Sequence, residues 1–361
     1  MHLITVVGAR PQFIKAAAVS RAIRERGDIV ESLVHTGQHF DDDMSQVFFD
    51  ELGIPHPKHH LGVRATTHGA MTGRMLEAIE AVLLTEQPEA VIVYGDTNST
   101  LAGALAAAKL HIPVAHVEAG LRSFNRRMPE ELNRVATDHL STLLLAPTQV
   151  AVANLEGEGI GGARVRLVGD VMYDIAVEFG SRDAAPAMAD HGLTPGRYVL
   201  TTVHRAENTD DLDRLVTIFE GLRLVARELP VVMPLHPRTR AALERAGLLA
   251  SVAGELHLTD PVGYVTMAAL ERNAAVIATD SGGMQKEAYF HRVPCVTLRD
   301  ETEWTELVEH GWNRLVPPTS AARVAASVLS ARGTLGGDVE LYGGGSAAQA
   351  VVDAIASHDW S

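Results

Sequence analysis

Short apolar runs alternate with longer stretches of helical periodicity along the 361-residue chain. This alternation is typical of parallel sheets whose strands are connected by helices. In the first half, the pattern predicts strands at 2–7, 29–34, 90–95, 113–118, 143–146 and 165–168. Between them it predicts helices at 11–26, 41–52, 66–87, 98–110 and 130–141.

The second half repeats the same logic. Strands are expected near 198–203, 231–235, 255–258, 275–279 and 294–298, and helices near 211–228, 238–247, 262–272, 283–291 and 320–332. A boundary is expected near 170–195, where residues 181–186 are small and polar and Thr194-Pro195-Gly196 predicts a turn. The glycines at 343–345 precede a last helix, 346–357, which Ser346 could cap.

These elements predict an α/β protein with two Rossmann-like, doubly wound domains that face each other across a cleft. The expected domains are 1–170 and 171–340, and the chain length suits two cores of this size. Such sheets bind ligands at the carboxyl ends of their strands. We therefore expect the functional residues to lie in the turns that follow the predicted strands.

Composition narrows the classes of function. The net charge of −14 disfavours nucleic-acid binding, although a local basic pocket could still hold a phosphorylated small molecule. The N-terminus has no basic leader and no long uncharged apolar segment occurs, so we expect a cytoplasmic protein without a membrane span. The single Cys295 excludes an intrachain disulfide and a cysteine-based zinc site, and its apolar neighbours predict a buried thiol.

Two apparent motifs carry little weight. Residues 157–162 fit the dinucleotide pattern G-x-G-x-x-G, but they follow a helical stretch and precede a strand, which is the wrong context. The first half also holds clustered histidines without a His-Glu-x-x-His helix, so we expect them to be hydrogen-bonding side chains and expect no metal site. These histidines are His35, His39, His56, His59 and His60.

Polar residues follow the predicted strands of the first half. Arg10 and Lys15 lie in the first strand-to-helix turn and could neutralise phosphate. Asp96 follows an apolar strand, where it could also serve as a helix cap. Glu118 closes another apolar strand, and a carboxylate there is costly unless it is used or paired, for example with Arg122. Glu130 opens a helix, where an acid also favours the helix dipole.

The second half offers cation-bearing and glycine-bearing turns. His204-Arg205 and His236 follow two of its strands. Ser281-Gly282-Gly283 would present backbone N–H groups at a helix start, which suits a diphosphate. Glu287, one turn further on, could bind ribose hydroxyls. Together with the turns of the first half, these residues predict a sugar nucleotide lying across the cleft.

Taken in order, the turns resemble those of the non-hydrolysing UDP-N-acetylglucosamine 2-epimerases. The resemblance runs along nearly the whole chain and implies a glycosyltransferase-B-like fold, a homodimer, and a C-terminal helix (346–361) that packs back on the first domain. The motifs that carry it are Gly8-Ala9-Arg10-Pro11 with Lys15, Gly95-Asp96-Thr97, His116 to Arg122, Pro129-Glu130-Glu131 with Asn133-Arg134, His204-Arg205, and Thr279 to Gly283.

The resemblance also implies roles for residues. Asp96, Glu118 and Glu130 correspond to catalytic acids, and His204 to a cleft histidine. The second domain would bind UDP. The implied substrate contacts are Arg10, Lys15, Arg205, His236, Tyr264, Ser281, Gly282, Gly283 and Glu287.

The implied reaction interconverts UDP-N-acetylglucosamine and UDP-N-acetylmannosamine by elimination of UDP to 2-acetamidoglucal and re-addition. It needs no cofactor and no metal, and its partner is a UDP-N-acetylhexosamine. A hydrolysing epimerase that releases N-acetylmannosamine, a glycosyltransferase of the same fold and an inactive sugar-nucleotide sensor are the alternatives.

The chain departs from the family pattern at three places. Gln12 stands where many bacterial members have Glu, and Trp304-Thr305 stands where many have Arg-Pro. The stretch Gln38 to Asp41 matches only part of the region where some bacterial members bind a second, activating UDP-N-acetylglucosamine.

Overall fold

The computed structural model describes residues 1–38, 53–65, 67–180 and 183–360. The chain forms two compact units. Unit 1 comprises Met1–Ile175 and Glu340–Ser361, and unit 2 comprises Ala176–Val339. The expected helix at 41–52, His39 and the stretch 39–41 lie outside the described residues.

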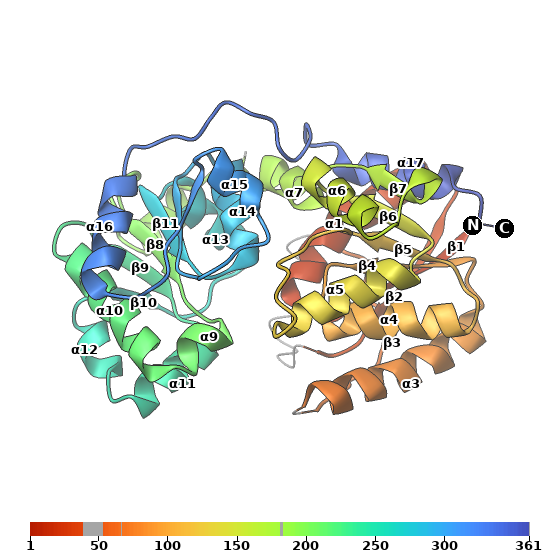
Figure 1. The fold of residues 1–361 in the computed structure, drawn as a ribbon, viewed down its shortest axis with the longest axis horizontal. Coiled ribbons are helices and arrows are strands. Elements are labelled where there is room, and N and C mark those ends of the chain that lie inside the picture. Colours follow the sequence, from red (N-terminus) through yellow and green to blue (C-terminus); the bar gives the residue numbers. More distant parts are fainter. Residues whose placement is uncertain (39–52, 66, 181–182, 361) are drawn as a thin grey trace. The chain divides into compact units, whose positions relative to one another are not determined.

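The described part of unit 1 contains a parallel sheet in the order β3-β2-β1-β4-β5-β6-β7 (Figure 1). The central strand β1 lies between β2 and β4, so the helix starts that follow β1 and β4 meet at the switch in strand order. The strands are β1 (His2–Val7), β2 (Val30–His35), β3 (His59–His60), β4 (Ala90–Tyr94), β5 (Val114–Val117), β6 (Leu143–Ala146) and β7 (Val165–Leu167).

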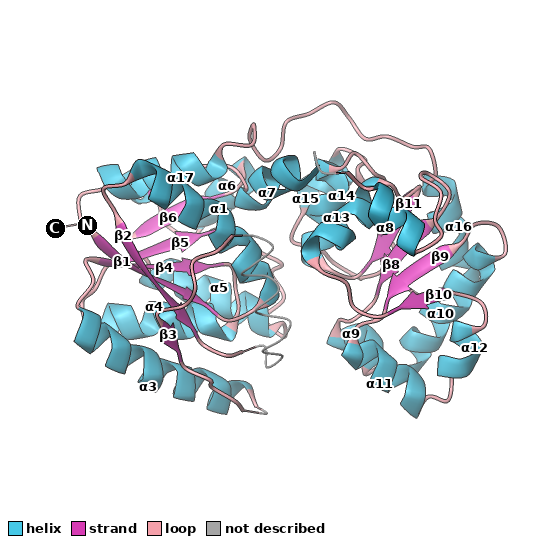
Figure 2. Ribbon diagram, turned by 180° about the vertical axis from the view of Figure 1, so that it is seen from behind, coloured by secondary structure: helices cyan, strands magenta, loops and turns pink. Residues whose placement is uncertain are grey.

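Helices cover both faces of this sheet. Figures 1 and 2 show α3, α4 and α5 along one face and α1, α6 and α17 along the other. Small residues let α4 approach closely, since a Cβ on Gly103 would lie 3.1 Å from a side-chain carbon of Val93. The bounds are α1 (Arg10–Arg26), α3 (His68–Glu86), α4 (Asn98–Lys109), α5 (Pro129–Leu140), α6 (Gln149–Gly157), the 3₁₀ turn Gly162–Arg164, α7 (Val171–Gly180) and α17 (Ala347–Ser357).

The last helix, α17, is held by a side chain from α7. The Asp174 carboxylate accepts hydrogen bonds from Ala347 N at 3.0 Å and Ala348 N at 2.7 Å. Ser346 occupies the N-cap position but makes no side-chain cap, so the expected role of its hydroxyl is wrong. A carboxylate is the stronger acceptor at a positive helix end.

Unit 2 has a parallel sheet in the order β10-β9-β8-β11-β12-β13. Its strands are β8 (Val199–Thr202), β9 (Val231–Pro234), β10 (His257–Thr259), β11 (Val276–Thr279), β12 (Cys295–Thr297) and β13 (Asn313–Leu315). Its helices are α8 (Ala185–Asp190), α9 (Ala206–Thr209), α10 (Leu212–Ala226), α11 (Pro237–Arg245), α12 (Leu249–Ala253), α13 (Tyr264–Arg272), α14 (Gly282–Phe290), α15 (Thr305–Glu309) and α16 (Ala321–Ala331).

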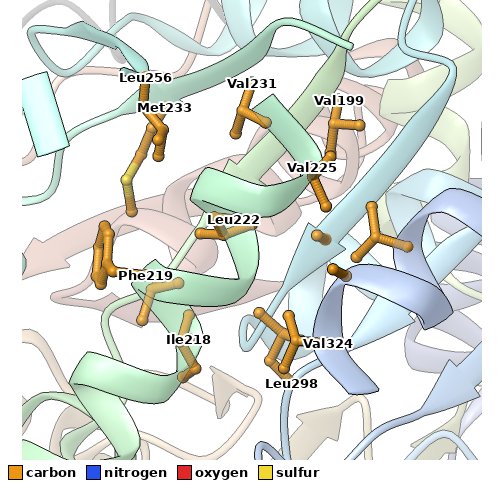
Figure 3. Packing of buried hydrophobic residues seen from close by; sticks show 14 of the residues in the cluster. Val199, Ile218, Phe219, Leu222, Val225, Val231, Met233, Leu256, Leu298 and Val324 are labelled. Carbon is orange, nitrogen blue, oxygen red and sulfur yellow. The ribbon is translucent and has the colours of Figure 1, made fainter. Parts of the chain in front are cut away.

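Alternate residues of the unit 2 strands face two separate apolar layers. Val199 packs with α10 and α16, whereas Leu200 packs with α8, α13 and α14. Figure 3 shows the first layer, in which Phe219 and Leu222 of α10 lie against side chains of the strands. Both units are therefore doubly wound parallel α/β structures, which confirms the expected fold class of each half.

The predicted strands are all present, with ends shifted by one or two residues. Two edge strands, β3 and β13, were missed because each has two or three residues and little apolar character. The expected boundary segment at 170–195 is largely helical, with α7 and α8 inside it, and the division between the two units falls within it, between Ile175 and Ala176. The turn at Thr194 is confirmed by the hydrogen bond from Arg197 N to Thr194 O.

Cys295 is buried, as predicted, and burial raises the pKa of its thiol to about 12. The pattern at 157–162 ends α6 and leads into β7, which confirms the wrong context for a dinucleotide loop. No helix in the described ranges is long and apolar enough to cross a membrane.

His291, at the end of α14, makes the stability of unit 2 depend on pH. Burial and the nearby charge of Arg272 lower the pKa of its imidazole from 6.5 to about 4, although the Glu271 carboxylate lies 3.6 Å from Nε2. Unfolded chains therefore bind a proton at higher pH than the folded protein does. The stabilisation is present above the unfolded pKa and is lost as the pH falls from about 6.5 to about 4.

We predict that acidification from about pH 7.5 to about pH 5 lowers the free energy of unfolding by about 2 kcal/mol more in the wild type than in His291→Phe. Urea unfolding at the two pH values measures the difference. His310→Phe, at an exposed position in the same unit, is the control and retains the wild-type dependence. Equal pH dependence in the wild type and His291→Phe would contradict the assignment.

Candidate active site

A buried ion pair marks the carboxyl end of the unit 1 sheet. Lys15 from α1 donates to the Glu118 carboxylate at 2.6 Å, and each side chain is 8% exposed. Glu118 follows β5 in a left-handed conformation with φ of 73°, which is uncommon for a residue with a side chain. The expectation that Glu118 pairs with Arg122 or another base is met by Lys15, and Arg122 binds Asp138 and Glu158. The pair places a cation and a carboxylate together at the end of the strand.

Gly95, at the end of β4, makes room for this ion pair. Its φ is +61°, and a Cβ at this position would lie 3.1 Å from Lys15 Nζ and 3.5 Å from Glu118 Oε1. Glycine has no Cβ and adopts the left-handed region without cost. The turn after β4 can therefore lie directly against the pair.

Asp96, the next residue, is held by Arg134 of α5. Arg134 Nε donates to Asp96 Oδ2 at 3.1 Å and Nη2 donates to the same oxygen, while Asn133 Nδ2 donates to the Asp96 backbone oxygen at 2.9 Å. The helix cap of α4 is Thr97, which accepts from Thr100 N, so the interpretation of Asp96 as a cap is wrong. Asp96 instead presents a partly exposed carboxylate beside a guanidinium.

The first turn of α5 carries two acids with different surroundings. Glu131 is buried, and its carboxylate accepts from Ser123 N and Phe124 N, both at 2.9 Å, and from Arg134 Nη1 at 3.0 Å. It thus fixes the loop between β5 and α5. Glu130 is half-buried in the same turn. Arg10 begins α1, and its side chain lies outside the described part of the structure.

A second network of charged residues contacts the turns that follow β4 and β5. Asp138 accepts from Gly120 N at 3.1 Å and Arg122 Nη1 at 2.7 Å, and its other oxygen lies 2.7 Å from His116 Nδ1. Arg122 also binds Glu158 through two hydrogen bonds of 2.7 Å. Burial alone raises the pKa of Asp138, but the hydrogen bonds and charges of His116 and Arg122 outweigh it and hold that pKa below its usual value.

In unit 2, the buried Asp280 organises the two central strand ends. Its carboxylate accepts from His204 N, Arg205 N and Asn208 Nδ2, each at 3.0 Å. The His204 ring lies 5.2 Å from the ring of His236, whose Nδ1 accepts from Arg238 N at 3.1 Å. Asp280 thereby joins the turn after β11 to the turn after β8.

The N-terminus of α14 has the features expected of an anion seat. Ser281 is the N-cap without a side-chain cap, and its own N–H donates to Thr279 Oγ1. The first helical N–H groups of Gly282 and Gly283 then remain available, since no acceptor among the described residues takes them. A Cβ on Gly282 would lie 2.5 Å from Glu303 Oε1, so the glycine leaves room for this buried carboxylate.

Two further predicted contacts of unit 2 are buried. Glu287 lies on α14, and Tyr264 begins α13 with its ring 5.7 Å from Phe179. Lys286, also on α14, has its Nζ over the Trp304 ring, 4.2 Å from the ring centroid. Arg299 is buried between Glu303 and Glu207, at 3.1 Å and 3.3 Å.

The structure thus brings Lys15, Glu118 and the Gly95-Asp96 turn together in unit 1. In unit 2 it brings His204 and Arg205 to Asp280, with His236 beside the His204 ring. Sequence reasoning missed the roles of Asp138, Asp280 and Arg299. The signal for Asp280 was available, since it follows a short strand whose first three residues, Val276 to Ala278, are apolar.

The clustered histidines have other partners. His59 Nε2 lies 2.8 Å from Glu86, and His35 stacks between Phe13 and His60. Within the described ranges, no three residues of the His, Cys, Asp and Glu types are grouped as a metal site requires.

The chain is similar to known proteins along nearly its whole length. A family model described as UDP-N-acetylglucosamine 2-epimerase matches residues 21–356. UDP-2,3-diacetamido-2,3-dideoxy-D-glucuronate 2-epimerase of Pseudomonas aeruginosa is 52% identical over 360 residues, 99% of both chains. A UDP-N-acetylglucosamine 2-epimerase homolog of Methanococcus maripaludis is 51% identical over 321 residues, 88% of both chains. The crystal structure of Methanocaldococcus jannaschii UDP-GlcNAc 2-epimerase with UDP-GlcNAc and UDP has a TM-score of 0.93 at 40% identity, covering 99% of this chain and 100% of that one.

We predict that Gly95→Ala lowers the free energy of unfolding by about 1–2 kcal/mol, because a Cβ in the left-handed region also displaces Lys15 Nζ. Gly157→Ala is the matched control: it lies in α6 with open space around it and should stabilise by about 0.5–1 kcal/mol. Chemical denaturation measures both. A neutral Gly95→Ala would show that the turn is not constrained as described.

Proposed function

The chain belongs to the UDP-N-acetylglucosamine 2-epimerase family, and from this premise we propose that it epimerises a UDP-linked 2-acetamido sugar at C2 without hydrolysing it. The observation that carries the proposal is the Lys15–Glu118 pair, which lies directly against the Gly95-Asp96 turn. Asp96 and Glu118 each have a cation beside the carboxylate, Arg134 and Lys15 respectively. Such carboxylates can transfer protons while a diphosphate departs. UDP-N-acetylglucosamine is the first proposed substrate.

The chemistry explains why carboxylates suffice. The C2 proton is not next to a carbonyl, so it is a poor acid in the ground state. Departure of UDP from C1 builds oxocarbenium character, which acidifies C2–H, and a carboxylate then removes the proton. The products are 2-acetamidoglucal and UDP. Re-addition of UDP, with protonation on the other face of C2, gives the epimer.

We assign the proton transfers to Asp96, Glu118 and Glu130. One of them removes the C2 proton and a second serves the opposite face. Lys15 and Arg134 each donate to one of these carboxylates and thereby hold it in position. Each positioned acid or base contributes about 10²–10⁴ in rate.

The leaving diphosphate is assigned to unit 2. The free N–H groups of Gly282 and Gly283 at the start of α14 and the Arg205 side chain supply donors and positive charge for it. His204 belongs to the turn that Asp280 joins to this seat, and its ring lies 5.2 Å from the ring of His236. Glu287 and Tyr264 are assigned to the nucleoside. Arg10 and Lys15 complete the set of phosphate-neutralising cations.

A second substrate is favoured by one observation. The relative that is 52% identical over 99% of both chains is named for UDP-2,3-diacetamido-2,3-dideoxy-D-glucuronate. This sugar has the same C1 diphosphate and C2 acetamido group, so the same acids would act on it. The two candidates differ at C3 and C6, and the ratio of their kcat/KM values decides between them.

Incubation of the protein with UDP-N-acetylglucosamine in D₂O tests the reaction. We predict that deuterium enters at C2 and that UDP-N-acetylmannosamine accumulates, as read by NMR, without added metal or NAD. The diacetamido uronate is run in parallel at the same concentration. Free N-acetylmannosamine would identify a hydrolysing enzyme instead. Absence of deuterium from both sugars would contradict the proposal.

We predict that Asp96→Asn and Glu118→Gln each lower kcat at least about 100-fold on the better substrate, because each removes a positioned acid or base. Calorimetric titration with UDP should give affinities close to that of the wild type. Glu25→Gln, which removes an exposed carboxylate from α1, is the control and keeps full activity. If both site variants kept full activity, the assigned acids would be wrong.

A further inference from the structure

His116 of β5 is fully buried, and each of its ring nitrogens lies against an oxygen. Nδ1 lies 2.7 Å from Asp138 Oδ1, and Nε2 lies 2.7 Å from the backbone oxygen of Gly95. A carbonyl oxygen has no proton to give, so Nε2 must carry one. The ring therefore donates a hydrogen bond to the turn that precedes Asp96.

Asp138 holds the other side of the ring and a second turn as well. Its Oδ2 accepts from Gly120 N and from Arg122 Nη1, which favours the ionised carboxylate. Its pKa lies below the usual value despite complete burial. Because Asp138 Oδ1 accepts, Nδ1 is also placed as a donor, so each ring nitrogen of His116 faces an acceptor.

The two turns held by this pair carry two of the assigned acids. The Gly95 oxygen belongs to the peptide that joins Gly95 to Asp96. Gly120 lies two residues after Glu118, and both have left-handed backbone conformations, with φ of 84° and 73°. A left-handed residue with a side chain is retained only where the surrounding structure fixes it.

We propose that His116 is a positioning residue, which through Asp138 and the Gly95 carbonyl holds the Asp96 turn in register with the Glu118 turn. This inference rests on the proposed function, because it concerns the placement of the acids assigned there. Among the described residues, the hydrogen-bond partners of the His116 ring are Asp138 and the Gly95 oxygen, and neither is an assigned acid. A displacement of about 1 Å between reacting groups lowers rates about 100-fold, so losing this register should lower kcat.

A matched pair of substitutions separates the two hydrogen bonds of the ring. In His116→Asn the side-chain amide reaches the position of Nδ1, keeps the bond to Asp138 and loses the bond to Gly95. In His116→Gln the amide reaches the position of Nε2 and keeps the bond to Gly95. We expect kcat to fall about 100-fold in the Asn variant and less than about 10-fold in the Gln variant.

KM and the affinity for UDP should change less than about threefold in both variants, because the substrate contacts remain. Thermal unfolding is measured alongside. If the role of His116 were only structural, kcat per folded molecule would stay near the wild-type value in both variants. That result, or an equal loss of kcat in both, would overturn the proposal.

Asp138→Asn is the third variant and retains the shape of the pair. Its amide oxygen can accept from Gly120 and Arg122, and its NH₂ group can donate to His116 Nδ1, which leaves a neutral ring with its proton on Nε2. The bond to Gly95 then survives. We expect kcat within about fivefold of the wild type, and a loss as large as that of His116→Asn would overturn the proposal.

Nitrogen-15 NMR of the histidine rings tests the same bond without a substrate. The wild type should show a protonated Nε2 on His116 at about pH 8, and Asp138→Asn should keep that proton while Nδ1 loses its own. An unprotonated Nε2 in the wild type would overturn the proposal. If the wild type epimerised neither UDP-sugar while this spectrum held, the proposed function would fail and the positioning of the two turns would stand.

Discussion

The unit 1 site depends on one ion pair between residues far apart in the chain. Lys15 and Glu118 are separated by 103 positions, yet their side chains meet at 2.6 Å with little exposure to solvent. Two buried charges are tolerated when their geometry and further hydrogen bonds compensate for lost hydration. The parallel sheet supplies that geometry, because β1 and β5 flank β4 and their ends open on the same edge.

In unit 2, a single buried carboxylate, that of Asp280, joins the turns at two strand ends. The turns after β8 and β11 expose backbone N–H groups at the point where the strand order reverses, and Asp280 accepts from two of them. In unit 1 the comparable carboxylate, Asp138, comes from α5 and accepts from Gly120 and, through His116, reaches Gly95. In both units a buried acid fixes two neighbouring turns, so the residues on those turns keep a defined separation.

Much of this arrangement could be predicted from the sequence, because apolar runs mark central strands and the ends of parallel strands share an edge. Glu118 and Asp96 were found in this way. Their partners were not, since spacing along the chain favours Arg122 for Glu118 and contains no information on Lys15 or Arg134. The α7 helix was not predicted, because nearby glycine and proline residues were taken as signs of a loop. The helical spacing of its apolar residues was overlooked, although Ile175 and Phe179 are both buried. The edge strand β3 is too short for any pattern to identify.

The departures from the family pattern fall on residues that support the turns. Gln12 accepts from Gly8 N and Ala9 N and donates to the Tyr94 backbone oxygen at 2.9 Å, a donation that a carboxylate cannot make. Trp304 provides a ring face for the buried Lys286. None of these departures falls on an acid assigned to proton transfer. The two candidate substrates share the groups on which those acids act. A preference for one of these substrates must therefore arise from residues that contact C3 and C6, and the identity of the acids does not predict that preference.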